Sequence, residues 1–157
     1  VSRECSKYGY EPVMLTDQLC CQAKEAGSFL ASIAKTHCKS GKKLAYIAGG
    51  ETVVNITGHG KGGRNQEIAL SAAEGIKGMS NAAVFSIGSD GTDGPTDAAG
   101  GYSDGYTAGE LKNKGIDIFE VLKNNDAYNA LKLTEGLIIT GPTGTNVNDV
   151  SVLLISD

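Results

Sequence analysis

The spacing of hydrophobic positions divides the chain into short strands and amphipathic helices. Apolar residues recur every three or four positions after Asp17 and up to about Cys38, which predicts a helix capped by Asp17. The same spacing predicts a helix over about Asn65–Lys77 and two or three short helices between Gly105 and Leu133. Short apolar or β-branched runs bounded by turn residues predict strands. The expected strands are 11–16, 44–48, 52–57, 82–88, 137–140 and 150–155.

Strands that alternate with helices predict an α/β fold for residues 1–157, taken as a single domain. We expect a layered sandwich with a mixed, mainly parallel sheet, helices on both faces, and strands that end in glycine-rich loops. Because ligands of open α/β sheets bind beyond the carboxyl ends of strands, several of these loops should share one cleft. The chain opens on valine, so we expect it to begin inside a longer protein.

Composition and net charge argue against several classes of function. The net charge is −4 and Lys42–Lys43 is the longest basic run, so neither nucleic acid nor an anionic membrane is an expected partner. The apolar runs are far shorter than the roughly 20 residues of a membrane-spanning helix. No secretory leader pattern opens the sequence, and the four cysteines lack C-x-x-C spacing, so we expect reduced thiols in a cytoplasmic protein. Glycine accounts for 22 of 157 residues, which indicates loops that approach a ligand or another segment closely.

The glycine-rich segment 58–65 is the first candidate binding loop. Gly58-x-Gly60-x-x-Gly63 has the spacing of a dinucleotide fingerprint, but the expected strand before it mixes polar and apolar residues, unlike a central parallel strand. The more general expectation is that backbone N–H groups of this loop, together with Lys61 and Arg64, bind a phosphate or carboxylate. The alternative is a tight turn that carries a solvated basic pair.

Two further polar loops follow strands. In segment 89–97, Asp90 and Asp93 are candidate ligands of a hard cation such as Mg²⁺, and Asp90 is the best candidate for a metal or general-base role because it lies nearest the strand end. The alternative is ordinary Asp-Gly and Gly-Pro turn chemistry. Segment 141–149 offers hydroxyls and amides to a ligand, or else satisfies its own backbone. Glu51 either reaches the same cleft or faces water.

Four motifs taken together resemble a known family. Segments 49–52 (GGET), 58–67 (GHGKGGRNQE), 90–100 (DGTDGPTDAAG) and 140–149 (TGPTGTNVND) resemble, in this order, the C-terminal MOFRL domain of the type II glycerate 2-kinases. The resemblance covers nearly the whole chain, although the motifs fade in the helical region after Gly105. It implies phosphorylation of D-glycerate to 2-phosphoglycerate with ATP and a divalent metal, here Mg²⁺. Members of the family have often been labelled hydroxypyruvate reductases.

The resemblance also implies that a longer N-terminal domain is missing. Family members place the active site between two domains, so this chain would supply one side of the site and would be inactive alone. Arg64 matches the family's arginine, whereas the lysine that the N-terminal domain contributes has no counterpart here. We expect catalytic roles for Arg64, Lys61 and Asp90, and metal ligation by Asp90 and Asp93. The expected substrate-binding or phosphate-binding residues are Gly50, Glu51, Gly60, Gly62, Gly63, Asn65, Thr92, Thr143, Thr145, Asn146 and Asn148.

Two other functions stay open. One is an NAD(P)H-dependent hydroxypyruvate reductase built on the glycine fingerprint. The other is a non-catalytic domain that binds an anion without turnover. The sequence leaves open whether the protein forms a homodimer, and it does not say which loop holds nucleotide and which holds glycerate.

Overall fold

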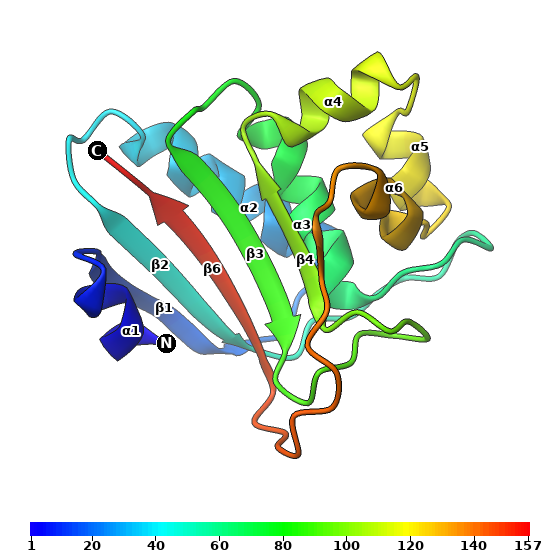
Figure 1. Ribbon diagram of the computed structural model, residues 1–157, viewed down its shortest axis with the longest axis horizontal. Coiled ribbons are helices and arrows are strands. Elements are labelled where there is room, and N and C mark those ends of the chain that lie inside the picture. The colour runs from blue at the N-terminus through cyan, green and yellow to red at the C-terminus, as the bar shows by residue number, and fades with distance from the viewer.

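Six strands form one sheet in the computed structural model, which describes residues 1–157 (Figure 1). The strands lie in the order β1-β2-β6-β3-β4-β5. Their bounds are β1 Glu11–Leu19, β2 Leu44–Gly50, β3 Ala82–Gly88, β4 Gly100–Asp104, β5 Leu137–Ile138 and β6 Asp149–Ile155. The helices are α1 Ser2–Lys7, α2 Ala23–His37, α3 Arg64–Gly75, α4 Thr107–Asn113, α5 Ile118–Lys123 and α6 Ala127–Leu133.

The α/β architecture and the mixed sheet are confirmed, but the prediction of a mainly parallel sheet is wrong. Only β1 and β2 pair in parallel, and the other neighbours are antiparallel. Helix α2 connects β1 to β2, and α3 connects β2 to β3. These three strands run in the same direction. However, β6 lies between β2 and β3 and runs the opposite way, so the two strands that α3 connects are never hydrogen-bonded to each other.

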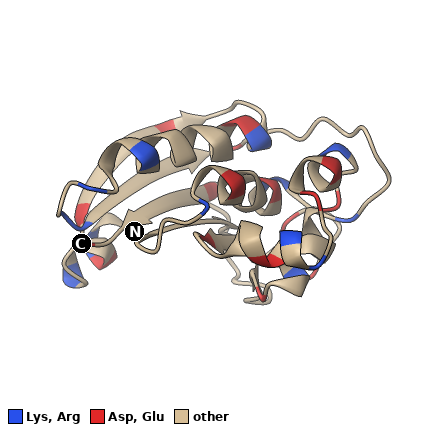
Figure 2. Cartoon of the chain, turned by 90° about the horizontal axis from the view of Figure 1, so that it is seen from above, with Lys and Arg blue, Asp and Glu red and all other residues tan.

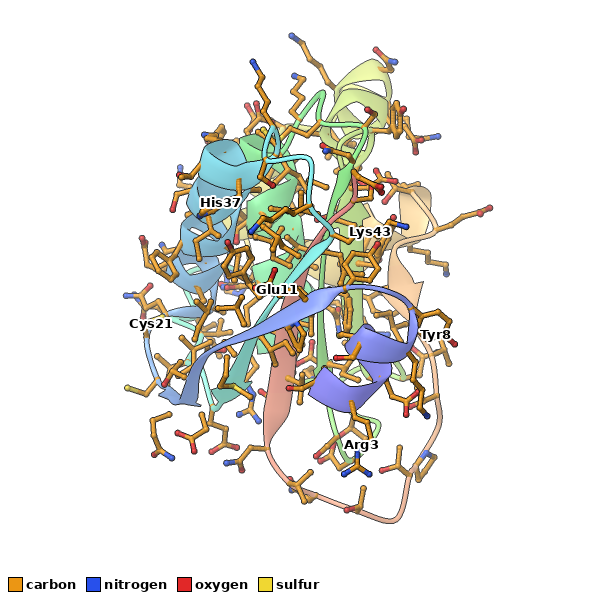
Figure 3. The ribbon with its side chains drawn as sticks, turned by 90° about the vertical axis from the view of Figure 1, so that its left-hand side faces the viewer. Arg3, Tyr8, Glu11, Cys21, His37 and Lys43 are labelled. Carbon is orange, nitrogen blue, oxygen red and sulfur yellow. The ribbon has the colours of Figure 1, made fainter.

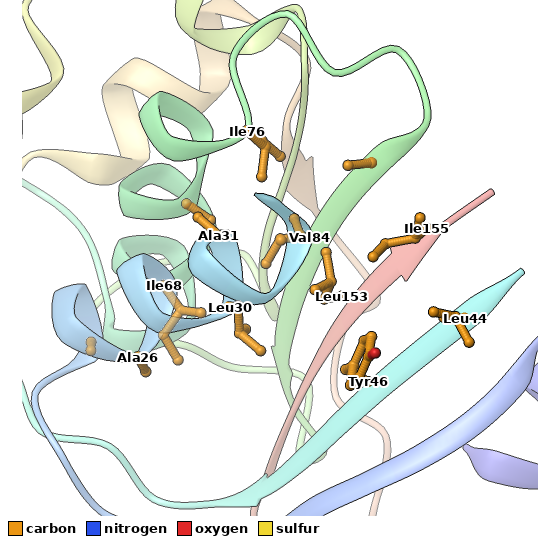
Figure 4. Packing of buried hydrophobic residues seen from close by; sticks show 14 residues of the cluster. Ala26, Leu30, Ala31, Leu44, Tyr46, Ile68, Ile76, Val84, Leu153 and Ile155 are labelled. Atoms are coloured by element: carbon orange, nitrogen blue, oxygen red, sulfur yellow. The ribbon is translucent and has the colours of Figure 1, made fainter. Parts of the chain in front are cut away.

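The helices cover the two faces of the sheet unequally. Helices α2 and α3 pack on one face, and the short α1 lies on the opposite face beside β1 (Figures 1 and 3). Between the sheet and the two long helices lies a core of 14 buried hydrophobic residues, among them Leu30, Ile68 and Leu153 (Figure 4). A second cluster of nine buried hydrophobic residues joins α3 to α4, α5 and α6.

The carboxyl ends of β2 and β3 lie on either side of the start of β6, at one end of the central strands. Asp149, the first residue of β6, is in register with Gly50 of β2 on one side and with Gly88 of β3 on the other. The loops that follow β2 and β3, and the loop that precedes β6, therefore converge here (Figure 1). This convergence agrees with the expected shared cleft.

Several local predictions need correction. Strand β1 continues through Asp17 to Leu19, so Asp17 does not cap α2; the helix begins at Ala23 after Gln22, whose side chain makes no capping bond. Segment 52–57 is not a strand, because Val53 forms only an isolated bridge to Gln22. Strand β4 was not predicted, since it begins with Gly100 and Gly101. A Cβ at Gly101 would lie 2.6 Å from Leu131 Cδ1, so glycine lets α6 pack closely over this strand.

Charged residues are dispersed over the molecule. Lys and Arg occur on several elements, with Asp and Glu between them (Figure 2). All four cysteines are free thiols. None of the helices combines the length and apolar character needed to cross a lipid bilayer.

Candidate active site

A cavity of about 550 Å³ opens where the segments that follow β2 and β3 meet the N terminus of α3. This volume is in the range of small-molecule sites. Its walls come from the segment after β2, the glycine segment, the first turn of α3, the loop after β3 and the turn between α5 and α6. The lining residues are Thr52, Val53, Val54, Ile56, Gly58, Gly60, Gly62, Gly63, Arg64, Glu67, Asp90, Thr92, Asp93, Gly94, Pro95 and Asn125.

The turn Asn124–Asp126 holds the glycine segment in place. Asn125 Oδ1 accepts hydrogen bonds from the N–H groups of Thr57 and Gly58, and Asp126 Oδ1 accepts from Lys61 N. Glycine is needed because a Cβ at position 58 would lie 2.4 Å from the Asn124 backbone. These N–H groups are therefore not available to an anion.

Three consecutive backbone N–H groups remain at the end of the segment. Those of Gly62, Gly63 and Arg64 make no hydrogen bond within the chain, and all three residues line the cavity. Adjacent free N–H groups can bind the oxygens of a phosphate or carboxylate. The expected anion contact is thus confined to Gly62, Gly63 and Arg64.

Arg64, the first residue of α3, sits in a network of carboxylates. Its Nε lies 2.5 Å and its Nη2 3.2 Å from the two oxygens of Asp149, and Nη2 also donates to Glu51 Oε1 at 2.9 Å. The bond to Asp149 raises the pKa of the guanidinium further above its ordinary value. About a third of the side chain remains exposed, and Nη1 donates no hydrogen bond within the chain. Arg64 is thus fixed in orientation with one nitrogen left for a ligand.

Asp93 caps α3. Its Oδ1 accepts from Asn65 N and Nδ2, and its Oδ2 accepts from Gln66 N, while the residue is only 3% exposed. Burial raises the pKa of Asp93, and these hydrogen bonds oppose the rise. Asn65 is also internal, since its Oδ1 accepts from Ser86 Oγ. The carboxylate expected to bind a metal thus stabilises a helix, and the amide expected to bind substrate orients that carboxylate.

Asp90 is the more accessible of the two expected metal ligands. Its Oδ1 accepts from Thr92 N and Thr92 Oγ1, and these bonds lower the pKa of Asp90, which keeps it ionised. No group of three or more His, Cys, Asp or Glu residues gathers in an arrangement that would hold a metal ion. The donor set fits a cation that takes one carboxylate from the protein and its other ligands from water and phosphate, as Mg²⁺ does.

The remaining expected residues lie outside the cavity lining. The ammonium of Lys61 lies 4.0 Å from the centre of the Tyr128 ring. Gly50 and Asn148 line a separate small pocket together with Glu51. Thr143 donates from Oγ1 to Ser89 O and from N to Asp90 O, so its loop supports the Asp90 loop from outside. Thr145 and Asn146 are exposed in that same loop.

Sequence reasoning missed three polar residues of the cavity: Thr52, Glu67 and Asn125. Glu67 follows Arg64 by three residues, a spacing that places both on one face of a helix and that was readable in the sequence. Asn125 has φ 55°, which a sequence pattern does not reveal. Thr52 is 3% exposed, and its Oγ1 is buried without a hydrogen-bond partner in the chain.

Comparison with known proteins places this site in a family. The profile described as the MOFRL family matches residues 44–149, a range that contains every cavity residue. The chain belongs to the MOFRL family. The resemblance expected from the four motifs is therefore confirmed.

Relatives of this MOFRL chain carry two kinds of name. D-glycerate 2-kinase of Thermotoga maritima is 54% identical over 94% of the chain, and glycerate 2-kinase of Pyrococcus horikoshii is 45% identical over 99%. A relative from Agrobacterium vitis, 38% identical over 94% of the chain, has a hydroxypyruvate reductase name. The chain spans 36% of the length of each of the two kinases and 40% of the Agrobacterium protein.

A solved structure has the same fold as this MOFRL chain. The crystal structure of glycerate kinase from Thermotoga maritima matches with a TM-score of 0.94 at 52% identity, over 98% of this chain and 38% of that one. This chain therefore has the fold of one part of that longer protein.

Proposed function

We propose that this chain is one domain, the C-terminal part of a two-domain D-glycerate 2-kinase. The enzyme transfers the γ-phosphoryl group of ATP, bound with Mg²⁺, to the 2-hydroxyl of D-glycerate. This chain supplies one side of the active site and is inactive alone. The names of its relatives and the small share of their length that it spans support the proposal. The same proposal places the enzyme in the cytoplasm, where its free thiols stay reduced.

One observation carries the proposal: Arg64 and three free N–H groups face a cavity that also holds Asp90. Phosphoryl transfer needs positioning and charge neutralisation more than covalent chemistry. Arg64 and the N–H groups of Gly62 and Gly63 bind an anionic group, either the transferring phosphate or the glycerate carboxylate. Asp90 binds the Mg²⁺ that accompanies the nucleotide.

The reductase alternative has less physical support. In a dinucleotide-binding fold, the glycine fingerprint links a parallel strand to the open N terminus of a helix. Here no sheet strand leads directly into Gly58, because β2 ends at Gly50 and segment 52–57 forms only an isolated bridge at Val53.

A coupled assay separates the candidate functions. The two-domain enzyme, supplied with D-glycerate, ATP and Mg²⁺, should release ADP in proportion to the 2-phosphoglycerate formed. Consumption of NADH with hydroxypyruvate, without ADP release, would instead establish the reductase. Saturable binding of glycerate or phosphate with neither reaction would establish a non-catalytic anion-binding domain.

Arg64→Ala in the two-domain enzyme should lower kcat/KM about 100-fold or more, since a positioned charge on the transferring group is lost. Arg64→Lys should restore only part of the rate, because an ammonium cannot reproduce the paired bonds to Asp149. The exposed Arg3 in α1 provides the matched control, and Arg3→Ala should leave the rate unchanged. A near-normal rate in Arg64→Ala would remove this residue from the mechanism.

A further inference from the structure

Three carboxylates line the cavity, and their oxygens are engaged differently. Both oxygens of Asp93 accept hydrogen bonds from the start of α3. Asp90 is partly exposed and turned toward Thr92. Glu67 is buried, at 4% exposure, and uses only one oxygen: Oε1 accepts from Asn125 Nδ2 at 2.9 Å.

The second oxygen of Glu67 is left for a ligand. Oε2 makes no hydrogen bond in the chain, and it is not among the fully buried unpaired atoms. Because Glu67 lines the cavity, this oxygen is reached from the cavity. Glu67 lies one helical turn after Arg64, so α3 presents a cation and a carboxylate on the same wall.

We propose that Glu67 is the general base of the reaction, a role that rests on the proposed kinase function. Oε2 accepts the proton as the O–H bond of the glycerate 2-hydroxyl breaks. The hydroxyl oxygen forms a bond to the γ-phosphorus of ATP, and the bond from that phosphorus to the β,γ-bridging oxygen breaks. ADP leaves with the electron pair of the broken bond, so no further reactant is needed.

The electrostatic surroundings of Glu67 suit a base. Burial raises the pKa of Glu67, and the negative charge of Asp93 adds to the rise, while the Asn125 bond and Lys24 of α2 oppose it. A base works best when its pKa is near the working pH. Asp90 is the poorer base, because its bonds from Thr92 lower the pKa of that carboxyl.

A purely structural role for Glu67 makes a different prediction. Asn125 also donates to Asn55 O and accepts from Thr57 N and Gly58 N, so Glu67 helps to hold the residue that positions the glycine segment. Glu67→Gln keeps an oxygen that can accept from Asn125 but cannot take up a proton. A structural role would therefore survive this substitution, whereas a base would not.

The test is steady-state kinetics of the two-domain enzyme from about pH 5 to 9. Wild-type kcat should fall at low pH as Glu67 becomes protonated. Glu67→Gln should lower kcat about 100-fold or more and leave the KM for ATP within about threefold. It should also abolish the fall of kcat at low pH, which is the acidic limb of the pH profile. Glu67→Asp, which keeps a carboxylate, should retain that limb at a reduced rate. Glu74→Gln, on the exposed face of α3, is the matched control and should behave as wild type.

Two results with Glu67→Gln would overturn the role of Glu67. One is near wild-type kcat in Glu67→Gln. The other is a reduced kcat with the acidic limb still present in a variant whose thermal unfolding matches wild type. If Glu67→Gln does not fold, the pH profile of Glu67→Asp decides. Absence of the acidic limb in that variant would also overturn the role of Glu67 as general base. Failure of wild type itself to release ADP would refute the kinase function, and with it this inference.

Discussion

At the scale of single residues, the carboxylates around Arg64 divide the work of the site. Asp149, with its side chain 8% exposed, fixes the guanidinium, and Glu51 supports it from the surface. Asp93 caps the N terminus of α3, and hydrogen bonds from Thr92 keep Asp90 ionised. Only Glu67 is both buried and partly unpaired, so its ionisation should affect the stability of the fold as well as the reaction.

Glu67→Gln should therefore change stability in a pH-dependent way. The folded-state pKa of Glu67 is raised, so between its ordinary pKa and the raised value the folded state binds more protons than the unfolded state. Stability from this group is present at low pH and is lost as pH rises through that window. The variant should match wild type at about pH 4 and exceed its free energy of unfolding at about pH 7. Urea unfolding at both pH values, with Glu74→Gln as control, measures this. An equal difference at both pH values would contradict it.

The glycine-rich surroundings of Arg64 predict that it binds an anion, but they do not reveal its partner Asp149, because 85 positions separate the two residues in the sequence. The same limit applies to Asp93. An Asp-Gly turn is compatible with metal binding or with capping, and only the approach of α3 selects capping. Lys61 shows the reverse case: a basic residue in a binding loop whose side chain packs on Tyr128.

At the scale of elements, glycine sets how closely α2 and α3 approach. Gly27 of α2 faces Ser71 of α3, and Gly75 of α3 faces Ala31 of α2. A Cβ on Gly27 would lie 2.0 Å from Ser71 Oγ and 2.2 Å from Ile68 O. This close contact fixes α3, whose first turn carries Arg64 and Glu67.

Two helical glycines should respond oppositely to alanine. Gly27→Ala should destabilise the fold by about 1–3 kcal/mol, because the backbone of Ile68 cannot move away without displacing α3. Gly109 in α4 has open space around its Cβ position, so Gly109→Ala should stabilise by about 0.5–1 kcal/mol through helix propensity. Thermal or urea unfolding of both variants measures the difference. The same sign in both would refute the packing argument.

Most elements were predictable from periodicity, since α2, α3, β2, β3 and β6 carry strong apolar patterns. Strand β4 lacked that signal, because it begins with two glycines: Gly100 lies against the backbone of β3, and Gly101 lies against α3 and α6. Segment 52–57 showed the opposite failure. Its β-branched residues look like a strand, yet Val53, Val54 and Ile56 line the cavity instead of joining the sheet.

At the scale of the whole molecule, the fold has its own hydrophobic core. Two clusters of 14 and nine buried hydrophobic residues fall within these 157 residues. The cavity lies at the surface, with Arg64 a third exposed. Strands joined through a helix are expected to run in the same direction, as β1, β2 and β3 do. The position of β6 between β2 and β3 depends instead on pairings between residues that are distant in sequence.

The isolated chain should fold cooperatively and yet release no ADP from ATP and D-glycerate. Its buried clusters support folding, whereas the proposed kinase completes its active site with a second domain. Circular dichroism during thermal unfolding checks the first part, and the coupled assay checks the second. Turnover by the isolated chain close to that of the two-domain enzyme would show that one domain suffices.

The central position of β6 has a consequence for how the protein is made. Residues 149–155 are synthesised after every other strand, yet they bridge β2 and β3 and bring Asp149 to Arg64. Until they emerge from the ribosome, the nascent sheet is split, with the edges of β2 and β3 open to wrong partners. Completion of the sheet and pairing of Asp149 with Arg64 therefore happen together, when β6 takes its place between β2 and β3.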